Sequence, residues 1–267
     1  AVLFRKQQAG HTYEVRSAGQ TRRLYTDGDF HSQYNPNHAV TGSIWDLLFL
    51  PSLFREPGAF KRVLVLGVGG GAVIHMLNRF AQPQQIVGVE LSRLHLQIAR
   101  QHFDLRYRNL QLVQANAIEW LIEYDGEPFD LIIDDLYFEE QGEPTRAIAA
   151  DASWFDILLD HLSDDGLLVM NFVSGREWRD SGYFAEDFVR ESFPAAYRLT
   201  TPTVITWWRR CRVSRCSCAT GASGCVSSRN WMSAMPAAAC ATASPKCNQQ
   251  DSLNTLKLLS QIGRAHV

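Results

Sequence analysis

A short apolar run followed by a cluster of glycines constrains this chain more than any other stretch. Val63 to Leu66 are consecutive apolar residues, typical of a buried parallel strand, and a helical apolar pattern begins at Ala72. Glycines at a strand-to-helix turn let the backbone approach a ligand closely, and the first turn of a helix offers unpaired N–H groups. The sequence therefore predicts a strand, a ligand-binding turn and a helix. The glycines assigned to cofactor binding are Gly67, Gly69, Gly70 and Gly71.

A second predicted strand ends in an acidic residue at a spacing that strengthens this prediction. The strand covers residues 86–89, and Glu90 follows it directly. In nucleotide-binding α/β folds an acid lies about twenty residues after the glycines and accepts hydrogen bonds from ribose hydroxyls. We therefore assign Glu90 to cofactor binding. The alternative is a structural turn followed by a solvated carboxylate.

Predicted strands and helices then alternate along the chain, as a doubly wound, mostly parallel sheet requires. Before them, apolar–polar alternation with turns at Gly19 and Gly28 predicts a small set of antiparallel β-hairpins. The predicted fold class is therefore α/β, with an N-terminal β-hairpin region at residues 1–52 and a nucleotide-binding domain at residues 53–207. Within that domain, we expect residues 136–147 to form a loop and residues 197–207 to supply one strand.

The last part of the chain, residues 208–267, differs in composition from the rest. It is rich in Arg, Ser, Ala and Cys, lacks apolar periodicity, and holds all six cysteines between Cys211 and Cys247. Residues 262–267 match the translation of a common sequencing adapter. We expect this tail to be either disordered or non-native, the product of a frameshift. The cysteine-free remainder suits the reducing cytoplasm, which is the expected location.

Composition and charge argue against several classes of partner. The 28 acidic and 26 basic residues give a net charge of −2, which offers no electrostatic basis for nucleic-acid binding. No apolar run is long enough to span a bilayer, so no membrane partner is expected. The histidines show no HExxH spacing and the cysteines no paired CxxC arrangement, so we expect no bound metal.

A polar residue follows the third predicted strand of the domain. Asn116 lies shortly after that strand, at residues 110–113, and begins a predicted helix. Folds of this type contact an adenine ring at this place, and an Asn side chain can accept from its amine and donate to a ring nitrogen. We assign Asn116 to cofactor binding. Capping of the helix is an alternative role, and the two roles are compatible.

Acidic residues gather where the fourth predicted strand ends. Five carboxylates lie between Asp134 and Glu143, and the first two close an apolar strand beside the glycine turn. Ligands bind at this edge of open α/β sheets, and such a cluster suits a cationic substrate. Asp135 is the predicted catalytic residue, able to deprotonate an amine. The predicted substrate-binding residues are Asp134, Tyr137, Glu139 and Glu140.

Two alternatives apply to this acidic segment. The glutamates could form only a solvated loop face. For Asp134 a packing role is also expected, because alternation along a strand points it away from the face that Asp135 occupies.

Taken in order, these motifs resemble the spermidine synthase family, a branch of the Rossmann-like methyltransferase fold. The resemblance covers about residues 13–207 and is carried by the segments 23–28, 67–72, 89–90, 115–117 and 129–135. It implies that Glu90 binds the ribose of S-adenosylmethionine or of its decarboxylated form. By the same resemblance, Asn116 binds the adenine and Asp135 meets the attacking amine. Ala117, which follows Asn116 in the matching segment, is assigned to cofactor binding. The implied partners are this small-molecule donor and an amine-type acceptor, and a homodimer is a further expectation.

Three departures from the family weigh against polyamine synthesis itself. Aminopropyltransferases of the family carry an Asp in the glycine loop that binds the donor's amine, and Gly70 stands at that position. A Tyr followed by His or Gln is replaced by Ser43 and Ile44, and a second loop acid by Phe138. The resemblance thus implies a transferase that moves either an aminopropyl or a methyl group. The alternatives are a non-catalytic nucleotide-binding protein and an NAD-binding oxidoreductase, whose glycine spacing this chain lacks.

Overall fold

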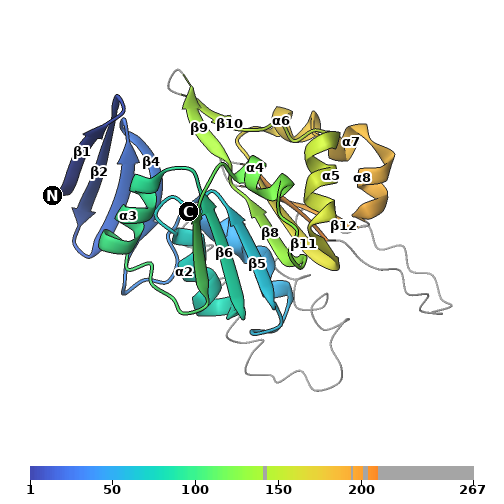
Figure 1. Cartoon of the computed structure of the whole chain (residues 1–267), viewed down its shortest axis with the longest axis horizontal. Helices are drawn as coiled ribbons and strands as arrows, with labels where there is room; N and C mark the ends of the chain where they lie inside the picture. Colours follow the sequence, from blue (N-terminus) through green and yellow to red (C-terminus); the bar gives the residue numbers. More distant parts are fainter. Residues whose placement is uncertain (141–142, 194, 201–203, 210–267) are drawn as a thin grey trace. The chain divides into compact units, whose positions relative to one another are not determined.

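A computed structural model describes residues 1–140, 143–193, 195–200 and 204–209, and divides the chain into a unit at Ala1–Cys211 and a second at Arg212–Val267 (Figure 1). The second unit lies outside the described residues, and so does the tail predicted to start at residue 208, apart from the two residues that end the last strand. The predicted disordered or frameshifted origin of the tail therefore stays a prediction.

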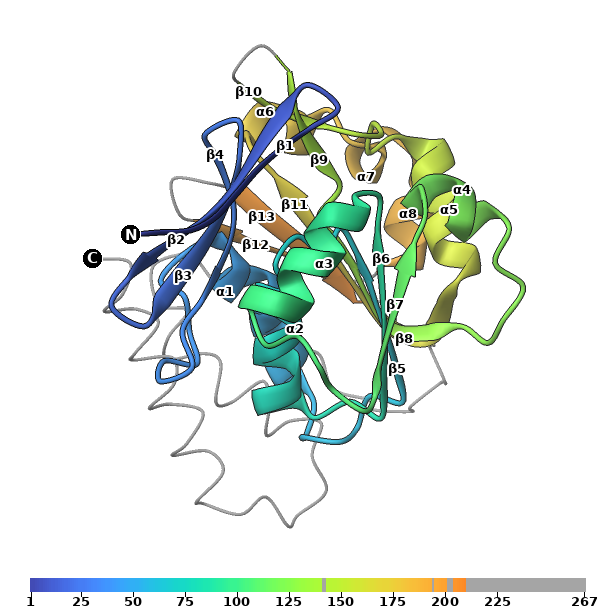
Figure 2. The same ribbon diagram turned by 60° about the vertical axis from the view of Figure 1, so that its left-hand side comes forward.

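The N-terminal region is a four-stranded antiparallel sheet in the order β1-β2-β3-β4. Its strands are β1 Val2–Gln8, β2 His11–Ala18, β3 Thr21–Thr26 and β4 Asp29–Tyr34. Val15 and Leu24 are fully buried and pack against apolar residues of helix α3, Arg93–His102. Figure 2 shows the strands lying beside this helix. The predicted β-hairpin region is confirmed, and one face of it packs against α3.

The second sheet has seven strands in the order β12-β13-β11-β8-β5-β6-β7. Five of them run parallel: β5 Arg62–Leu66, β6 Gln85–Glu90, β7 Leu110–Gln114, β8 Phe129–Asp134 and β11 Leu162–Phe172. Strand β5 has β6 on one side and β8 on the other, so the strand order reverses there. This arrangement confirms the predicted fold class, and it places the expected ligand edge at the carboxyl ends of β5, β6 and β8.

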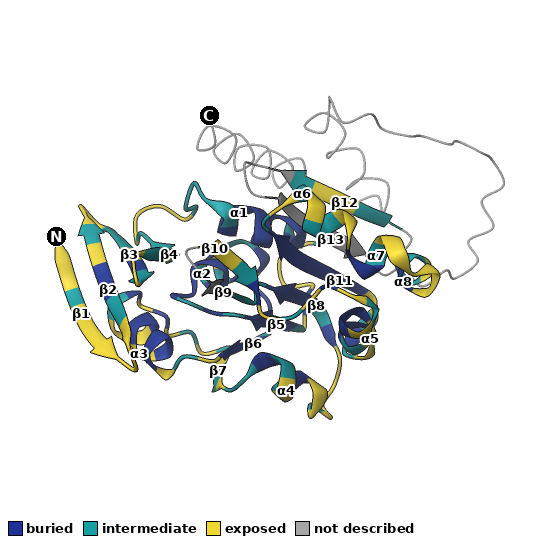
Figure 3. Cartoon of the chain, turned by 90° about the horizontal axis from the view of Figure 1, so that it is seen from above, coloured by how far each residue is buried: buried dark blue, intermediate teal, exposed yellow. Residues whose placement is uncertain are grey.

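Helices cover both faces of this sheet (Figure 3). On one face, Trp154, Phe155 and Leu121 join a core built on the apolar residues of β5, β6, β8 and β11. The helices of this face include α4 Ala117–Ile122, α5 Ala152–Asp160, α7 Gly182–Ala185 and α8 Asp187–Ser192. The remaining helices and helical turns are α1 Ile44–Phe49, the 3-10 turn η1 Leu50–Phe54, α2 Ala72–Met76, the π-turn η2 Leu77–Ala81 and α6 Gly175–Arg179. Alternating crossovers of this kind bury a parallel sheet from both sides.

Two expectations about local structure were wrong. The loop expected at residues 136–147 contains an antiparallel hairpin, β9 Tyr137–Glu140 with β10 Glu143–Arg146. Its base is tied to the core by the buried Arg146, a contact that the local charge pattern did not reveal. The segment expected to supply one strand supplies two, β12 Ala195–Thr200 and β13 Val204–Arg209, and β13 pairs with β11.

Candidate functional site

The glycine turn follows β5 and touches the end of β8. The Gly67 N–H donates to the Val89 carbonyl at 2.9 Å, and the Asp135 N–H donates to the Leu66 carbonyl at 2.9 Å. Gly67 has φ +84°, and a Cβ at this position would lie 2.3 Å from the Asp135 carbonyl oxygen. Only glycine fits both the backbone conformation and this approach. The turn therefore brings the predicted cofactor-binding and catalytic residues side by side.

Glu90, at the end of β6, is 8% exposed and holds the glycine turn through its carboxylate. Its Oε2 accepts from the backbone N–H groups of Val68 at 3.1 Å and Gly69 at 2.9 Å, and its Oε1 accepts from Ser92 at 2.8 Å. Burial by itself raises the pKa of Glu90, but His95 and the backbone N–H groups outweigh it, so the pKa is lowered. The carboxylate is thus ionised and aimed at the turn. Its contact with ribose stays a prediction.

Two histidines that the sequence analysis did not single out lie near Glu90. His95 of α3 has its Nδ1 3.6 Å from Glu90 Oε1 and its Nε2 3.0 Å from the Thr26 hydroxyl. The ring of His31, from β4, lies 5.3 Å from that of His95. Burial, together with the neighbouring His95, lowers the pKa of His31 to about 4, so His31 is neutral at physiological pH. Residues of the N-terminal sheet therefore lie close to Glu90, the carboxylate that is predicted to bind ribose.

Gly70, where the family carries an acid, lies against the N-terminal sheet. A Cβ on Gly70 would meet Ser32 Cβ at 2.7 Å and Ser32 Oγ at 2.8 Å. An aspartate could enter this position only if β4 moved. The departure from the family motif at Gly70 therefore accompanies close packing between the turn and β4.

Asn116 caps α4, and its neighbour lies in the core. The Asn116 side-chain oxygen accepts from the Ile118 N–H at 3.0 Å, as expected of a helix N-cap. Ala117 is 5% exposed and belongs to the apolar core, so its methyl group faces away from solvent. The cofactor contacts of both residues stay predictions, and for Ala117 only the backbone is placed to make one.

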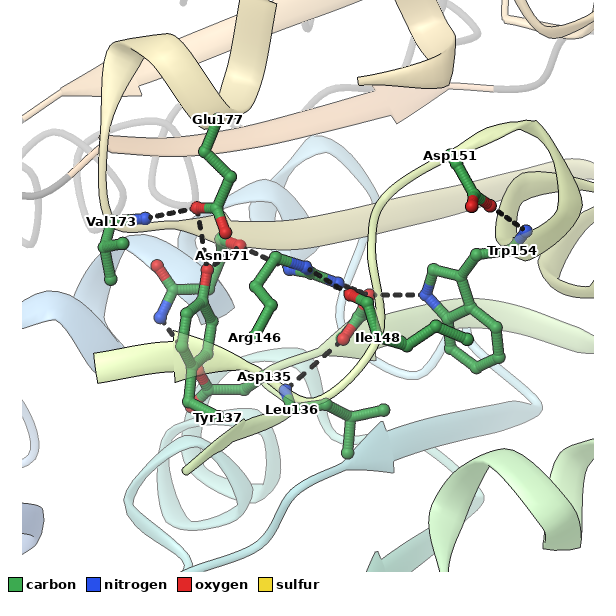
Figure 4. Close-up of polar contacts among 11 residues, drawn as sticks. Asp135, Leu136, Tyr137, Arg146, Ile148, Asp151, Trp154, Asn171, Val173 and Glu177 are labelled. Atoms are coloured by element: carbon green, nitrogen blue, oxygen red, sulfur yellow. Dashed lines mark hydrogen bonds and ion pairs between the residues drawn. The ribbon is translucent and has the colours of Figure 1, made fainter. Parts of the chain in front are cut away.

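Asp134 and Asp135 have opposite surroundings, as strand alternation predicts. Asp134 is fully buried; its Oδ2 accepts from Arg146 Nη2 at 2.5 Å and from Trp154 Nε1 at 2.9 Å (Figure 4). Because this side chain has no exposed surface, it cannot meet a substrate directly. We correct its assignment from substrate binding to packing of the hairpin against the sheet.

Asp135 is partly buried, and Asn171 of β11 orients it. Asn171 Nδ2 donates to Asp135 Oδ1 at 2.8 Å, while the Asn171 Oδ1 is buried without a hydrogen-bond partner among the described residues. Burial raises the pKa of Asp135 to about 6, helped by the charges of Asp134 and Glu90. A carboxyl with such a pKa is ionised at neutral pH yet is a stronger base than a solvated aspartate.

Tyr137, Glu139 and Glu140 lie on β9. The Tyr137 hydroxyl donates to the Asn171 carbonyl at 2.8 Å and lies 3.2 Å from Glu177 Oε2 (Figure 4). A predicted substrate contact of Tyr137 must therefore use its ring rather than its hydroxyl. The side chains of Glu139 and Glu140 lie outside the described residues, and their roles stay predictions.

Arg146, Asn171 and Glu177 were missed by the sequence analysis. Each contacts the end of β8 or the Tyr137 hydroxyl, from 12 to 40 residues away in the chain. No local pattern signals such contacts.

Among the described residues no group of three or more His, Cys, Asp or Glu side chains could hold a metal ion. No helix in the described part of the chain is long and apolar enough to cross a membrane.

Comparisons with known proteins bear on this site. A family model described as a methyltransferase domain matches residues 59–242. A polyamine aminopropyltransferase 2 from Caldanaerobacter subterraneus subsp. tengcongensis is 27% identical over 130 residues, which are 48% of this chain and 42% of that protein. The match thus spans less than half the length of this relative.

Solved structures show the same fold at low sequence identity. A probable spermidine synthase from Corynebacterium glutamicum superposes with a TM-score of 0.64 at 14% identity, covering 77% of this chain and 79% of that one. A spermidine synthase in complex with the transition state analogue AdoDATO superposes with a TM-score of 0.57 at 15% identity, covering 78% and 72%.

Proposed function

This chain belongs to the methyltransferase-domain family, and on that premise we propose that it is a spermidine synthase-like transferase that uses an S-adenosyl sulfonium donor. The observation that carries the proposal is the meeting of Glu90, the glycine turn and Asp135 at the carboxyl ends of adjacent strands. The resemblance to the spermidine synthase family is confirmed by the relatives. The alternatives, a protein without catalytic activity and an NAD-binding oxidoreductase, are not favoured.

The donor site is proposed to lie on the glycine turn, with Glu90 accepting from the ribose hydroxyls and Asn116 and Ala117 beside the adenine. The turn presents backbone rather than side chains, which allows close approach of a ligand. A spermidine synthase with this fold was solved with AdoDATO, which supports an adenosyl ligand here. To bind ribose, Glu90 would exchange its contacts with the Val68 and Gly69 N–H groups for contacts with the hydroxyls.

The acceptor is proposed to be an amine that approaches Asp135. Its nitrogen lone pair forms a bond to the carbon next to the sulfonium sulfur, and the old carbon–sulfur bond breaks with its electron pair moving onto sulfur. Asp135 takes the proton that the nitrogen loses, and the Asn171 Oδ1 offers a further acceptor for an amine N–H. The chain's contribution is alignment and proton removal, since the neutral thioether is already a good leaving group.

Methyl transfer from S-adenosylmethionine is the narrower proposal. The turn from Gly67 to Ala72 carries no acid that could pair with an aminopropyl ammonium group, and Ser32 leaves no room for one at Gly70. Aminopropyl transfer and a place in polyamine biosynthesis are the second candidate, supported by the aminopropyltransferase relative. A cytoplasmic location and a homodimer remain expectations of the same reading.

Calorimetry with S-adenosylmethionine and with its decarboxylated form tests the donor. We expect the former to bind more tightly, and we expect Glu90→Gln to weaken its binding. Incubation with a panel of amines then separates the two transfers by their by-products, S-adenosylhomocysteine for methyl transfer and methylthioadenosine for aminopropyl transfer. If neither donor binds, the proposal is contradicted. Binding without either by-product supports the non-catalytic alternative.

A further inference from the structure

Helix α3 buries a histidine behind Glu90. The helix begins after the cap Ser92, and its buried residues Leu94, Leu96 and Ile98 are apolar. His95 is 9% exposed among them. A buried imidazole costs free energy unless its nitrogens find partners. The position of His95 therefore calls for an explanation in its contacts.

Both ring nitrogens of His95 face polar groups from different parts of the chain. Nε2 lies 3.0 Å from the Thr26 hydroxyl of β3, and Nδ1 lies 3.6 Å from Glu90 Oε1. When the Thr26 hydroxyl donates to Nε2, the ring proton resides on Nδ1, where it points at the carboxylate. The edge of the ring meets Tyr13 of β2, with centroids 5.5 Å apart, which holds its plane.

The two oxygens of Glu90 are held from two sides. Oε2 accepts from the glycine turn, and Oε1 accepts from the Ser92 N–H and faces His95. A ligand on the turn competes for Oε2, whereas the Ser92 and His95 side lies behind the carboxylate. His95 can therefore keep the carboxylate aimed while the turn exchanges its contacts for those of a ligand.

We propose that His95 is a positioning residue for donor binding: it links Thr26 of the N-terminal sheet to Glu90 and holds the carboxylate where it accepts from both ribose hydroxyls. The N-terminal sheet then belongs to the nucleotide site through this link. This inference rests on the proposed function, and it names the ribose as the part of the ligand whose recognition depends on His95.

The test measures how tightly each protein variant binds two ligands, one with and one without the ribose hydroxyls. The ligands are S-adenosylhomocysteine and its 2′,3′-dideoxyribose analogue, measured by calorimetry on the full chain. His95→Leu is expected to weaken binding of the first ligand about tenfold, equal to about 1.4 kcal/mol, and of the dideoxy analogue less than about twofold. His95→Gln, which can still donate one hydrogen bond to the carboxylate, is expected to recover most of the loss. Thr26→Val is expected to show the same ligand dependence at a smaller amplitude, and it serves if His95→Leu does not fold.

His102→Leu is the matched control. His102 lies on the same helix and also contacts the N-terminal sheet, with its ring 5.3 Å from that of Phe4, but it lies seven residues from His95 at the far end of α3. Its replacement should leave both affinities within about twofold. Equal losses for both ligands in the His95 and Thr26 variants would reduce His95 to a packing role and overturn the inference, as would unchanged affinities. A wild-type chain that binds neither ligand would instead remove the proposed function, so the two failures are distinguishable.

Discussion

The carboxylates in the two halves of the candidate site accept hydrogen bonds from different kinds of partner. In the donor half, the glycine turn and Glu90, the carboxylate accepts mainly from backbone N–H groups at most 22 residues away in the chain. In the acceptor half, Asp134 and Asp135, the partners are side chains from β10, α5 and β11. Backbone contacts leave room for a ligand to replace them, whereas buried side-chain contacts hold the fold. Variants of the donor half should therefore affect binding, and variants of the acceptor half should affect stability.

The largest expected effect is the loss of Arg146. Arg146→Ala leaves Asp134 buried without its charge partner, and we expect the free energy of unfolding to fall by about 3–5 kcal/mol. Denaturant unfolding at neutral pH measures it. Adding Asp134→Asn should recover part of the loss, because it removes the unpaired charge and keeps an acceptor for Trp154. Arg176→Ala, which breaks an exposed ion pair with Asp180, is the control and should cost less than about 1 kcal/mol. Equal losses in the two arginine variants would show that the buried pair is not what anchors the acceptor half.

A smaller effect of the opposite kind is expected in the donor half. Glu90→Gln should weaken binding of an adenosyl ligand by about 1–3 kcal/mol, because neutral hydrogen bonds replace charge-assisted ones, while most of the stability is kept. Calorimetry and denaturant unfolding of the same variant separate the two effects. Glu177→Gln is the matched control, since Glu177 also accepts hydrogen bonds, but from Tyr137 and Val173 rather than from the glycine turn. Loss of affinity in Glu177→Gln but not in Glu90→Gln would reverse the assignment of the halves.

The smallest expected effect sharpens the comparison, because Asp135 should combine a catalytic role with a cost in stability. The folded chain holds the Asp135 proton up to about pH 6, because burial raises the pKa of this carboxyl above its ordinary value of 3.8. The unfolded state therefore releases this proton first, and stability falls as pH rises between these values. Asp135→Asn should raise the free energy of unfolding by about 1–2 kcal/mol above pH 6, and this gain should vanish below about pH 4.

Donor binding and single-turnover transfer complete the measurement on Asp135→Asn. Affinity should stay nearly unchanged, because Asp135 acts on the acceptor, while transfer should fall sharply. A variant that is no more stable at pH 8 than the parent would mean that the buried charge of Asp135 is fully compensated. Retained transfer per bound donor would remove the proposed role in catalysis.

The difference between the halves also explains what the sequence could predict. The strand, glycine turn and helix, the acid at the end of β6, and the cap at Asn116 were predictable, because each depends on contacts between nearby residues. The roles assigned to Glu90 and Asn116 toward a ligand stay predictions, because they depend on contacts with an adenosyl group rather than on contacts within the chain.

The acceptor half and the histidine link were not predictable from local patterns. Arg146 looked like part of a loop, Asn171 like a strand residue, and His95 meets Thr26 across 69 residues of chain. Such pairs depend on how strands align and on how the N-terminal sheet docks on α3, and neither can be read from periodicity. The same reason explains the error over β12 and β13, where the pairing partner β11 lies elsewhere in the chain.

The approach of Gly67 to the Asp135 carbonyl has a consequence for how this protein can change. Even a methyl group at position 67 would collide with the backbone that carries the proposed base. A substitution at Gly67 should therefore disturb both the ligand-binding turn and the position of Asp135. Variants selected only for retained ligand affinity should also keep Asp135 in place. Selection for ligand binding alone, or for transfer alone, should therefore keep glycine at position 67.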